Sequence, residues 1–368
     1  MKDIYELLND MDIDENEFEE MEVSEFEKAK VKRTVMKSLK QKKKIKGWKR
    51  NVATAAILVG LSITAFGLTF PAYAGSTPII GDIFRFLDNG RTGLYDDYKE
   101  YSTEINMTEE SKGIKVTIND AIYDGQTVSV TYSIESDRDL GDDPIIFDHL
   151  DIKGSTGTAG SSKISKVDEN HYVGLVTASS FNVTDEETIK IKWDIDSITI
   201  PEKQQEINGN WNFALALEAT ERNTQLSDRG AEQNGVKVNI GKLSITPMSF
   251  IVYYDQVVSE VVRNKWHGVY VDIEVKDNLG NSYSGEGNGG TGDSEGYNMS
   301  WSKTFGKLDS NATKLIITPH ITLWEHTSEN FGSVEITKDG PMEMPIPKKS
   351  GKGKEEFVLE DIIIELNK

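Results

Sequence analysis

Hydrophobic and polar residues follow three different patterns along this chain of 368 residues. Residues 1–50 contain short helical repeats, residues 52–70 form one run without a charged side chain, and residues from Ile114 onward alternate between apolar and polar. These patterns predict short helices, then one membrane span, then a long region of β-strands. The predicted fold is therefore mainly β.

The uncharged run from Val52 to Phe70 has the length of a membrane span. A helix rises roughly 1.5 Å per residue, so this run would cover about 28 Å, close to the roughly 30 Å hydrocarbon core of a bilayer. The basic residues beside the run all precede it, and they are Lys42, Lys43, Lys44, Lys46, Lys49 and Arg50. Because positive flanks stay in the cytoplasm, we expect a single-pass protein of the cell membrane with a cytoplasmic N-terminus and extracellular domains after Pro71.

A second interpretation of the same run is a cleaved secretion signal. Ala72-Tyr73-Ala74 before Gly75 has the small-x-small pattern of a signal peptidase site. A signal peptide has a short charged region and an apolar core of about 7–15 residues, whereas this run is longer and follows a long N-terminal segment. We therefore favour a permanent anchor and keep regulated cleavage at Ala72 and Ala74 as a hypothesis.

The first fifty residues contain two amphipathic helical patterns. Apolar residues at i, i+3, i+4 and i+7 predict a helix near residues 3–11, and Ser24 with Glu27 forms a capping box before a second helix. The apolar candidates for contact with a partner are Ile4, Leu7, Leu8, Met11, Phe18 and Phe26. The span belongs to lipid and the β-rich region lies across the membrane, so a cytoplasmic partner protein is predicted, held by helix-in-groove docking.

Charge divides this inner segment into two halves. Residues 1–27 hold one lysine and twelve acidic residues, whereas residues 28–50 hold twelve basic residues and no acidic one. Anionic lipid would attract the basic half and repel the acidic half. We therefore expect membrane lipid to bind the six cations beside the span, alone or together with a partner, and we expect a protein to bind the acidic half.

Residues after the span show the period-two alternation of strands that bury one face. The alternating runs are Ile114–Ile118, Val128–Ile134, Ile189–Ile195, Trp211–Leu217, Val236–Ile240 and Val269–Val275, with a partly alternating closing strand at 355–366. Asp124-Gly125 lies between the first two runs and is a hairpin turn signal. We expect two antiparallel β-sandwich-like extracellular domains.

A polar stretch from Glu221 to Gly235 is the best candidate for a break between these domains. The predicted organisation is a cytoplasmic helical segment at 1–50, a transmembrane helix at 51–71, a first β domain with a juxtamembrane element at 72–225, and a second β domain at 226–368. Residues 281–296 are rich in glycine and acids, and we expect them to form a mobile hairpin tip because they are too polar for a core.

Composition favours neither an enzyme nor a metal protein. The chain has no cysteine, which excludes disulfides, thiolate metal sites and thiol catalysis. His320 and His326 lack the ligand spacing of a zinc site, and Gly285–Gly290 matches G-x-G-x-x-G without the helix that would bind a pyrophosphate. A net charge of −20, which arises after residue 50, argues against direct binding of nucleic acid. We predict no catalytic residues, no metal and no cofactor.

Three features resemble a family of Gram-positive membrane-anchored proteins. These are Met1–Asn9, the Lys-rich juncture with its single span, and Ile79–Phe84 before a β-rich exterior. Members are often described as negative effectors, anti-sigma-like in action, of extracytoplasmic-function sigma factors, and their exterior domains have no known function. The resemblance covers the whole layout and is most specific over residues 1 to about 135.

The resemblance implies a transmembrane regulator of transcription. Residues 1–40 would sequester a cytoplasmic sigma factor, while the exterior would sense an unknown extracellular ligand or protein. The family transfers no established functional residues to this chain. The alternative is a surface-anchored adhesion or structural β module whose inner segment serves only as an anchor.

Overall fold

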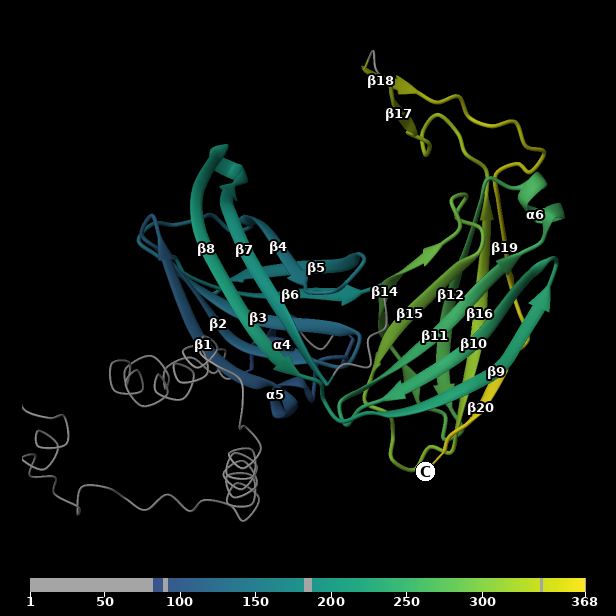
Figure 1. The fold of residues 1–368 in the computed structure, drawn as a ribbon, viewed down its shortest axis with the longest axis horizontal. Coiled ribbons are helices and arrows are strands. Elements are labelled where there is room, and N and C mark those ends of the chain that lie inside the picture. Colours follow the sequence, from purple (N-terminus) through teal and green to yellow (C-terminus); the bar gives the residue numbers. More distant parts are fainter. Residues whose placement is uncertain (1–81, 89–91, 182–186, 338–339, 368) are drawn as a thin grey trace, which may run out of the picture. The chain divides into compact units, whose positions relative to one another are not determined.

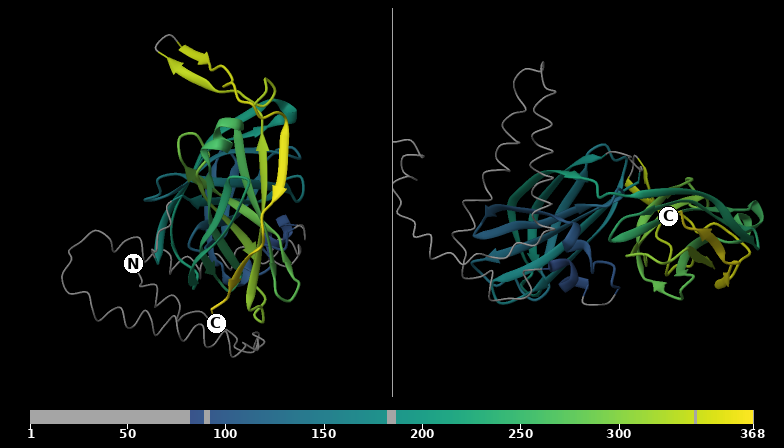
Figure 2. Two further views of the ribbon diagram at one scale, coloured as in Figure 1. Left: turned by 90° about the vertical axis from the view of Figure 1, so that its right-hand side faces the viewer. Right: turned by 90° about the horizontal axis from the view of Figure 1, so that it is seen from below.

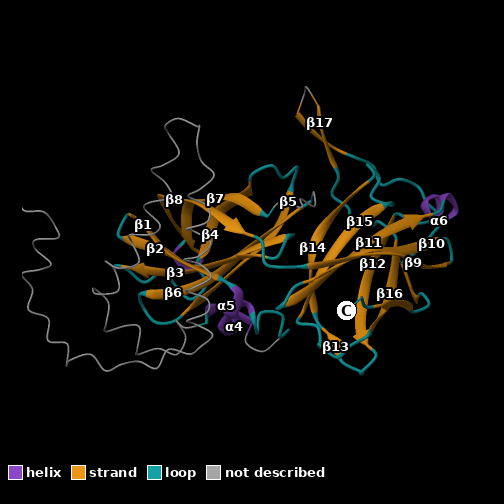
Figure 3. Cartoon of the chain, turned by 60° about the horizontal axis from the view of Figure 1, so that its bottom comes forward, coloured by secondary structure: helices purple, strands orange, loops and turns teal. Residues whose placement is uncertain are grey.

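The computed structural model of the protein describes residues 82–88, 92–181, 187–337 and 340–367 (Figure 1). Strands dominate these ranges, as Figure 3 shows, and they form several antiparallel sheets, which confirms the predicted mainly β fold. The described helices are short, and they are α4 (Ile83–Asp88), α5 (Tyr98–Tyr101), α6 (Glu260–Lys265) and the 3-10 turn η2 (Pro201–Lys203). In the described ranges no helix is long and apolar enough to cross a bilayer.

Several predicted features lie outside the described residues. They comprise the span at 51–71, the inner helices with their apolar contact candidates, the six cations and the alanines of the cleavage hypothesis. The first described element, α4, lies at the start of the predicted first β domain, where we expected a juxtamembrane element.

Two antiparallel sheets enclose the first core. Sheet A has the strand order β1-β2-β3-β6-β5, and sheet B has the order β4-β7-β8. Their strands are β1 (Thr103–Ser111), β2 (Ile114–Tyr123), β3 (Thr127–Ser136), β4 (Ile145–Ile152), β5 (Thr158–Lys166), β6 (His171–Ser180), β7 (Thr188–Ile200) and β8 (Gln205–Glu218). The ring of Trp193 from β7 lies 5.0 Å from Tyr132 of β3 and 5.4 Å from Phe213 of β8. These buried rings join the two sheets, so the core lies between them.

Two further sheets enclose a second core. Sheet C has the order β14-β15-β11-β10-β9, and sheet D has the order β13-β12-β16-β19, with β20 also beside β16. Their strands are β9 (Asn223–Gln233), β10 (Val236–Ile245), β11 (Ser249–Val258), β12 (Gly268–Asp277), β13 (Ser282–Tyr283), β14 (Gly285–Gly292), β15 (Met299–Gly306), β16 (Lys314–Trp324), β19 (Lys354–Val358) and β20 (Ile362–Glu365). Strands β17 (Val334–Thr337) and β18 (Gly340–Glu343) form a separate ribbon that projects away from these sheets (Figure 2). The closing strand expected at 355–366 is present as β19 and β20.

Two polar stretches, one expected to be a domain break and one expected to be a mobile tip, contain strands. The expected break at 221–235 is mostly β9, and the expected mobile tip at 281–296 contains β13 and β14. β9 and β14 are the two edges of sheet C. The tip expected at 281–296 was therefore wrong, whereas the stretch expected to be a domain break lies between Leu217, the last buried residue of the first core, and Val236, the first of the second. An edge strand needs a backbone partner on one side only, so polar and glycine-rich residues can join a sheet there.

The alternation pattern also missed central strands such as β6 and β11. In β6 nearly every residue is buried, so its sequence does not alternate. One face of β6 points into the first core, and its other face is contacted by α4 and β14. A strand buried on both faces has a continuous apolar or neutral sequence, which period-two analysis cannot recognise.

Gly174→Ala in β6 should destabilise the first core. Gly174 lies directly opposite Tyr132, and a Cβ at this position would overlap the buried Tyr132 ring. We expect the free energy of unfolding to fall by about 1–3 kcal/mol, since the ring has no free space to enter. Urea denaturation of the purified chain measures this change.

The matched control is Gly241→Ala in β10, where an added Cβ meets nothing within 4 Å. This variant should unfold at the same urea concentration as the parent protein. Equal loss of stability in both variants would contradict the role assigned to the Tyr132 ring.

Candidate functional site

The outer face of sheet A carries rows of hydroxyl side chains. In β3 the even-numbered residues from 128 to 134 belong to the core, so Thr127 and Ser129 point to the opposite face. The strand register places Ser179 beside Thr127, and it places Thr177 between Ser129 and Ser161. Ser129 and Ser179 are only 3% and 4% exposed. A face with the polarity of a solvent-exposed surface is therefore buried.

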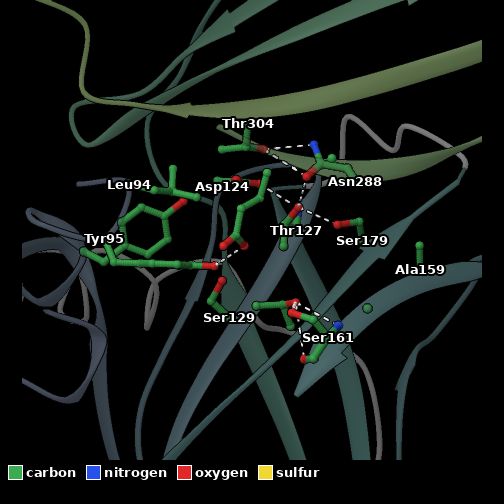
Figure 4. Close-up of a pocket in the computed structure, with 15 residues that line it drawn as sticks. Leu94, Tyr95, Asp124, Thr127, Ser129, Ala159, Ser161, Ser179, Asn288 and Thr304 are labelled. Carbon is green, nitrogen blue, oxygen red and sulfur yellow. Dashed lines mark hydrogen bonds between the residues drawn. The ribbon is translucent and has the colours of Figure 1, made fainter. Parts of the chain in front are cut away.

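One cover over this face is β14, the glycine-rich edge of sheet C. β14 contacts β5 and β6, and its Asn288 is 5% exposed. The Thr127 hydroxyl donates to Asn288 Oδ1 at 3.4 Å, and Asn288 Nδ2 donates to Thr304 Oγ1 of β15 at 2.9 Å (Figure 4). This side-chain amide therefore joins the hydroxyl rows of sheet A to sheet C.

A bulge in β14 allows this close approach. The register with β15 shifts between Gly287 and Gly290, and Gly289 has a φ of +78°. A Cβ on Gly289 would lie 2.7 Å from the Ala159 side chain of β5 and 3.0 Å from the Phe181 ring. Only glycine combines this backbone conformation with the available space. The glycine residues of β14 thus allow this strand to lie close to sheet A.

The second cover consists of residues that follow α4. Tyr95 and Tyr98 pack at 4.9 Å between ring centroids, and Phe84 of α4 lies 5.6 Å from Tyr98. This aromatic cluster also includes Leu175 of β6 and Met248 from the connection between β10 and β11. The cluster is therefore a small third core, and it contains residues from sheet A and from the connection between two strands of sheet C.

Glu286 of β14 interacts with two donors from earlier in the chain, Tyr95 and Lys163. Tyr95 Oη donates to Glu286 Oε2 at 3.1 Å, and Lys163 Nζ lies 3.0 Å from Glu286 Oε1. Burial raises the pKa of Tyr95, and the nearby Glu286 carboxylate raises it further. The Tyr95 hydroxyl therefore stays protonated and acts as a donor at neutral pH.

A cavity of about 150 Å³ remains between the hydroxyl rows and these covers (Figure 4). Its lining combines hydroxyl groups, two tyrosine rings, an amide and two carboxyl groups. The lining includes Leu94, Tyr95, Tyr98, Asp124, Thr127, Ser129, Ser161, Thr177, Ser179, Glu286, Asn288 and Thr304. Concave sites with converging polar groups are the usual form of a small-molecule site. This cavity is the candidate functional site.

Asp124 is the most unusual residue of the lining. It is 2% exposed, and its Oδ1 accepts hydrogen bonds from the backbone N–H groups of Gln126 at 2.8 Å and Thr127 at 2.7 Å. Its Oδ2 is buried without a hydrogen-bond partner among the described residues. Burial raises the pKa of Asp124 to about 6, although the two N–H donors and Arg222 act in the opposite direction.

Sequence reasoning identified Asp124 only as a turn residue. That role is confirmed, because its side chain caps the turn between β2 and β3 and Gly125 adopts a φ of +98°. The cavity itself was missed. The available signal was the outward-facing positions of β3 and β6, which carry hydroxyl groups where an exposed face would usually carry charges.

The structure does not bring other predicted site residues into this cavity. All partner, lipid and cleavage candidates lie outside the described ranges. His320 lies on β16, where its Nε2 is 3.4 Å from Glu274 Oε2, whereas His326 stacks on His267 at 5.1 Å. Within the described ranges no three His, Asp or Glu residues are arranged to hold a metal ion.

Comparison with known proteins found matches to two family models and to a crystal structure. Residues 42–136 match a domain of unknown function (DUF4179), and residues 223–366 match a family of unknown function (DUF5643). A crystal structure described as the conserved domain protein from Bacillus anthracis is 48% identical, with a TM-score of 0.70, and the match covers 79% of this chain and 100% of that one. This chain belongs to the same family as the Bacillus anthracis protein. None of the curated proteins matches it.

The limits of the family models coincide with structural elements. The first model ends at Ser136, the last residue of β3, and the second begins at Asn223, the first residue of β9. The cavity therefore takes its floor from the first matched region and from β5 and β6, and its β14 cover from the second. In this family member, the candidate site combines residues from both matched regions.

Asp124→Asn should change how stability depends on pH. The raised pKa of Asp124 means that the folded protein binds this proton more tightly than the unfolded chain, whose value is near 3.8. The resulting stabilisation is complete below about pH 4 and is lost as pH rises through about 6. Between pH 4 and 7 the free energy of unfolding of the variant should therefore rise by about 2–3 kcal/mol relative to the parent protein, as measured by urea denaturation.

Asp168→Asn provides a matched control in the turn between β5 and β6. Its Oδ1 accepts from Asn170 N and His171 N, both at 3.0 Å, which repeats the turn bonds of Asp124 at an exposed position. The bond from Asn170 N lowers the pKa of Asp168, so the control should change in the opposite direction with pH. A pH-independent difference between Asp124→Asn and the parent protein would exclude the raised pKa.

Proposed function

We propose that this protein is a single-pass membrane regulator, an anti-sigma-like negative effector of an extracytoplasmic-function sigma factor. One observation carries the proposal. The match to DUF4179 begins in the Lys-rich juncture, crosses the predicted span and ends with β3, which forms part of the cavity floor. A single family model thus covers both the predicted anchor and part of the candidate site, which supports the proposal.

The inner segment would hold the sigma factor. In this proposal Ile4, Leu7, Leu8 and Met11 form one apolar face of a cytoplasmic helix, with Phe18 and Phe26 extending it. The surrounding acidic residues would favour a basic surface on the partner and would keep this half away from anionic lipid. The basic half, residues 28–50, would remain at the membrane surface.

The exterior would act as the sensor. In this proposal the two sheet pairs are extracellular β-sandwich-like domains. α4 is the first described element after the predicted span, and Phe84 within it is fully buried in the aromatic cluster beside the cavity. A change at the cavity would therefore act on the segment nearest the membrane. Regulated cleavage at Ala72 and Ala74 would be one way to release the inner segment.

Physical continuity from α4 to the cavity supports this coupling. The buried carboxylate of Asp88, at the end of α4, accepts hydrogen bonds from the backbone N–H groups of Thr92 at 3.1 Å and Gly93 at 2.9 Å. These bonds fix the segment that leads to Tyr95, whose hydroxyl binds Glu286. α4 also contacts the lining directly, because the Phe84 ring packs against the rings of Tyr95 and Tyr98 within a buried cluster.

Leu7→Glu combined with Leu8→Glu should release the cytoplasmic partner. A carboxylate cannot be buried in an apolar groove without a large desolvation cost, so the amount of sigma factor that co-purifies with the full-length chain should fall roughly tenfold or more. The measurement is affinity purification from detergent-solubilised membranes, with bound proteins identified by mass spectrometry.

Asn9→Glu combined with Asn16→Glu adds the same charge at polar positions and should leave the bound sigma factor unchanged. Retention of the sigma factor by the Leu7 and Leu8 variant would contradict the proposed contact. Absence of a sigma factor from the parent protein's preparation would favour the alternative, a surface-anchored module whose inner segment is only an anchor.

A further inference from the structure

We propose that the cavity between sheet A and β14 binds a small organic cation through a primary ammonium group. This inference deepens the proposed function, because it names the chemistry that the exterior would sense. It rests on four properties of the cavity: the sign of its charges, an unpaired buried carboxylate oxygen, the hydrogen-bonding capacity of its hydroxyl groups, and its size.

The charged groups of the lining are acidic. Among the described residues that line the cavity, Asp124 and Glu286 carry the carboxyl groups, and none is a lysine, arginine or histidine. Lys163 of β5 pairs with Glu286 at 3.0 Å. Asp124 lies deeper, and Arg222 is the cation whose field lowers its pKa. The lining therefore favours a ligand with positive charge over an anion or a neutral molecule.

The buried Oδ2 of Asp124 needs a hydrogen-bond donor. Its partner oxygen, Oδ1, is satisfied by two backbone N–H groups, whereas Oδ2 has no donor within the described part of the chain. A carboxylate without full hydrogen bonding is costly in a dry site. An ammonium group supplies both the donor and the compensating charge, which makes the resulting hydrogen bond stronger than one from a neutral hydroxyl.

The remaining polar groups suit the rest of such a ligand. The Asn288 amide already bonds Thr127 and Thr304, so it has little free capacity. The hydroxyls of Ser161 and Thr177 bond to each other at 3.0 Å and keep part of their capacity, and the Ser129 hydroxyl can donate or accept beside them on the cavity floor. An ammonium ligand that also carries hydroxyl groups would therefore find partners at both ends.

The size of the cavity limits the ligand. A cavity of about 150 Å³ is large enough for a benzene-sized molecule. Serinol, 2-amino-1,3-propanediol, is a suitable probe because it has six non-hydrogen atoms, one ammonium group and two hydroxyls. Glycerol is its neutral counterpart, with a hydroxyl in place of the ammonium and almost the same shape.

One cation, one further carboxyl group and two phenols lie around Asp124 and affect how binding depends on pH. Arg222 favours its ionised form, while Glu286 of β14 and the phenols Tyr95 and Tyr98 complete the polar environment. Because the pKa of Asp124 is about 6, the carboxylate that binds the cation is present above this pH. Serinol affinity should therefore decrease as pH falls through about 6.

The test is isothermal titration of the full-length chain in detergent micelles with serinol and, separately, with glycerol. We expect serinol to bind in about the millimolar range and glycerol to bind at least about tenfold more weakly. Equal affinity for the two probes, or no heat of binding from serinol, would overturn the ammonium assignment.

Asp124→Asn should weaken serinol binding at least about tenfold, and Glu286→Gln should weaken it less because Glu286 already has two partners. Asp168→Asn keeps the same turn chemistry outside the cavity and should bind serinol like the parent protein. Unchanged affinity in a folded Asp124→Asn variant would contradict the site. Sigma-factor retention, tested separately, reports on the inner segment, so failure of one proposal is distinguishable from failure of the other.

Discussion

Burial of the polar outer face of sheet A is the constraint on which the rest of this structure depends. A sheet usually leaves one face to solvent when the other packs on a core. Here β14 and the segment after α4 cover that second face, where Thr127 donates to Asn288 and Glu286 accepts from Tyr95 and Lys163, which satisfies part of its polarity. The rows of hydroxyl side chains are therefore buried although they are polar. The space above them is a polar cavity.

This arrangement connects three parts of the chain that are far apart in sequence. The segment nearest the predicted membrane supplies Phe84 and Tyr95, sheet A supplies the floor, and β14 supplies Glu286 and Asn288. Any molecule in the cavity would contact elements from all three. For a protein proposed to carry a signal across a membrane, a molecule bound here would act most directly on the proposed anchor.

The same residues carry structural and chemical roles together. Asp124 caps the turn between β2 and β3 with one oxygen and leaves the other buried in the cavity wall. The glycines of β14 permit close approach to Ala159 because they carry no side chain. Stability and the proposed ligand recognition would therefore be linked at this junction, since both depend on how closely β14 lies against sheet A.

Local patterns in the sequence determined a large part of this protein. Period-two alternation located β2, β3, β7, β8, β10 and β12, and Asp124-Gly125 located a hairpin, because strand faces and tight turns depend on neighbouring residues. Tertiary structure alone decided that polar and glycine-rich segments become the edge strands β9 and β14, that β6 is buried on both faces, and that a turn aspartate lines a cavity. These outcomes depend on which distant segments cover a surface, and the period of a single strand contains no information about its cover.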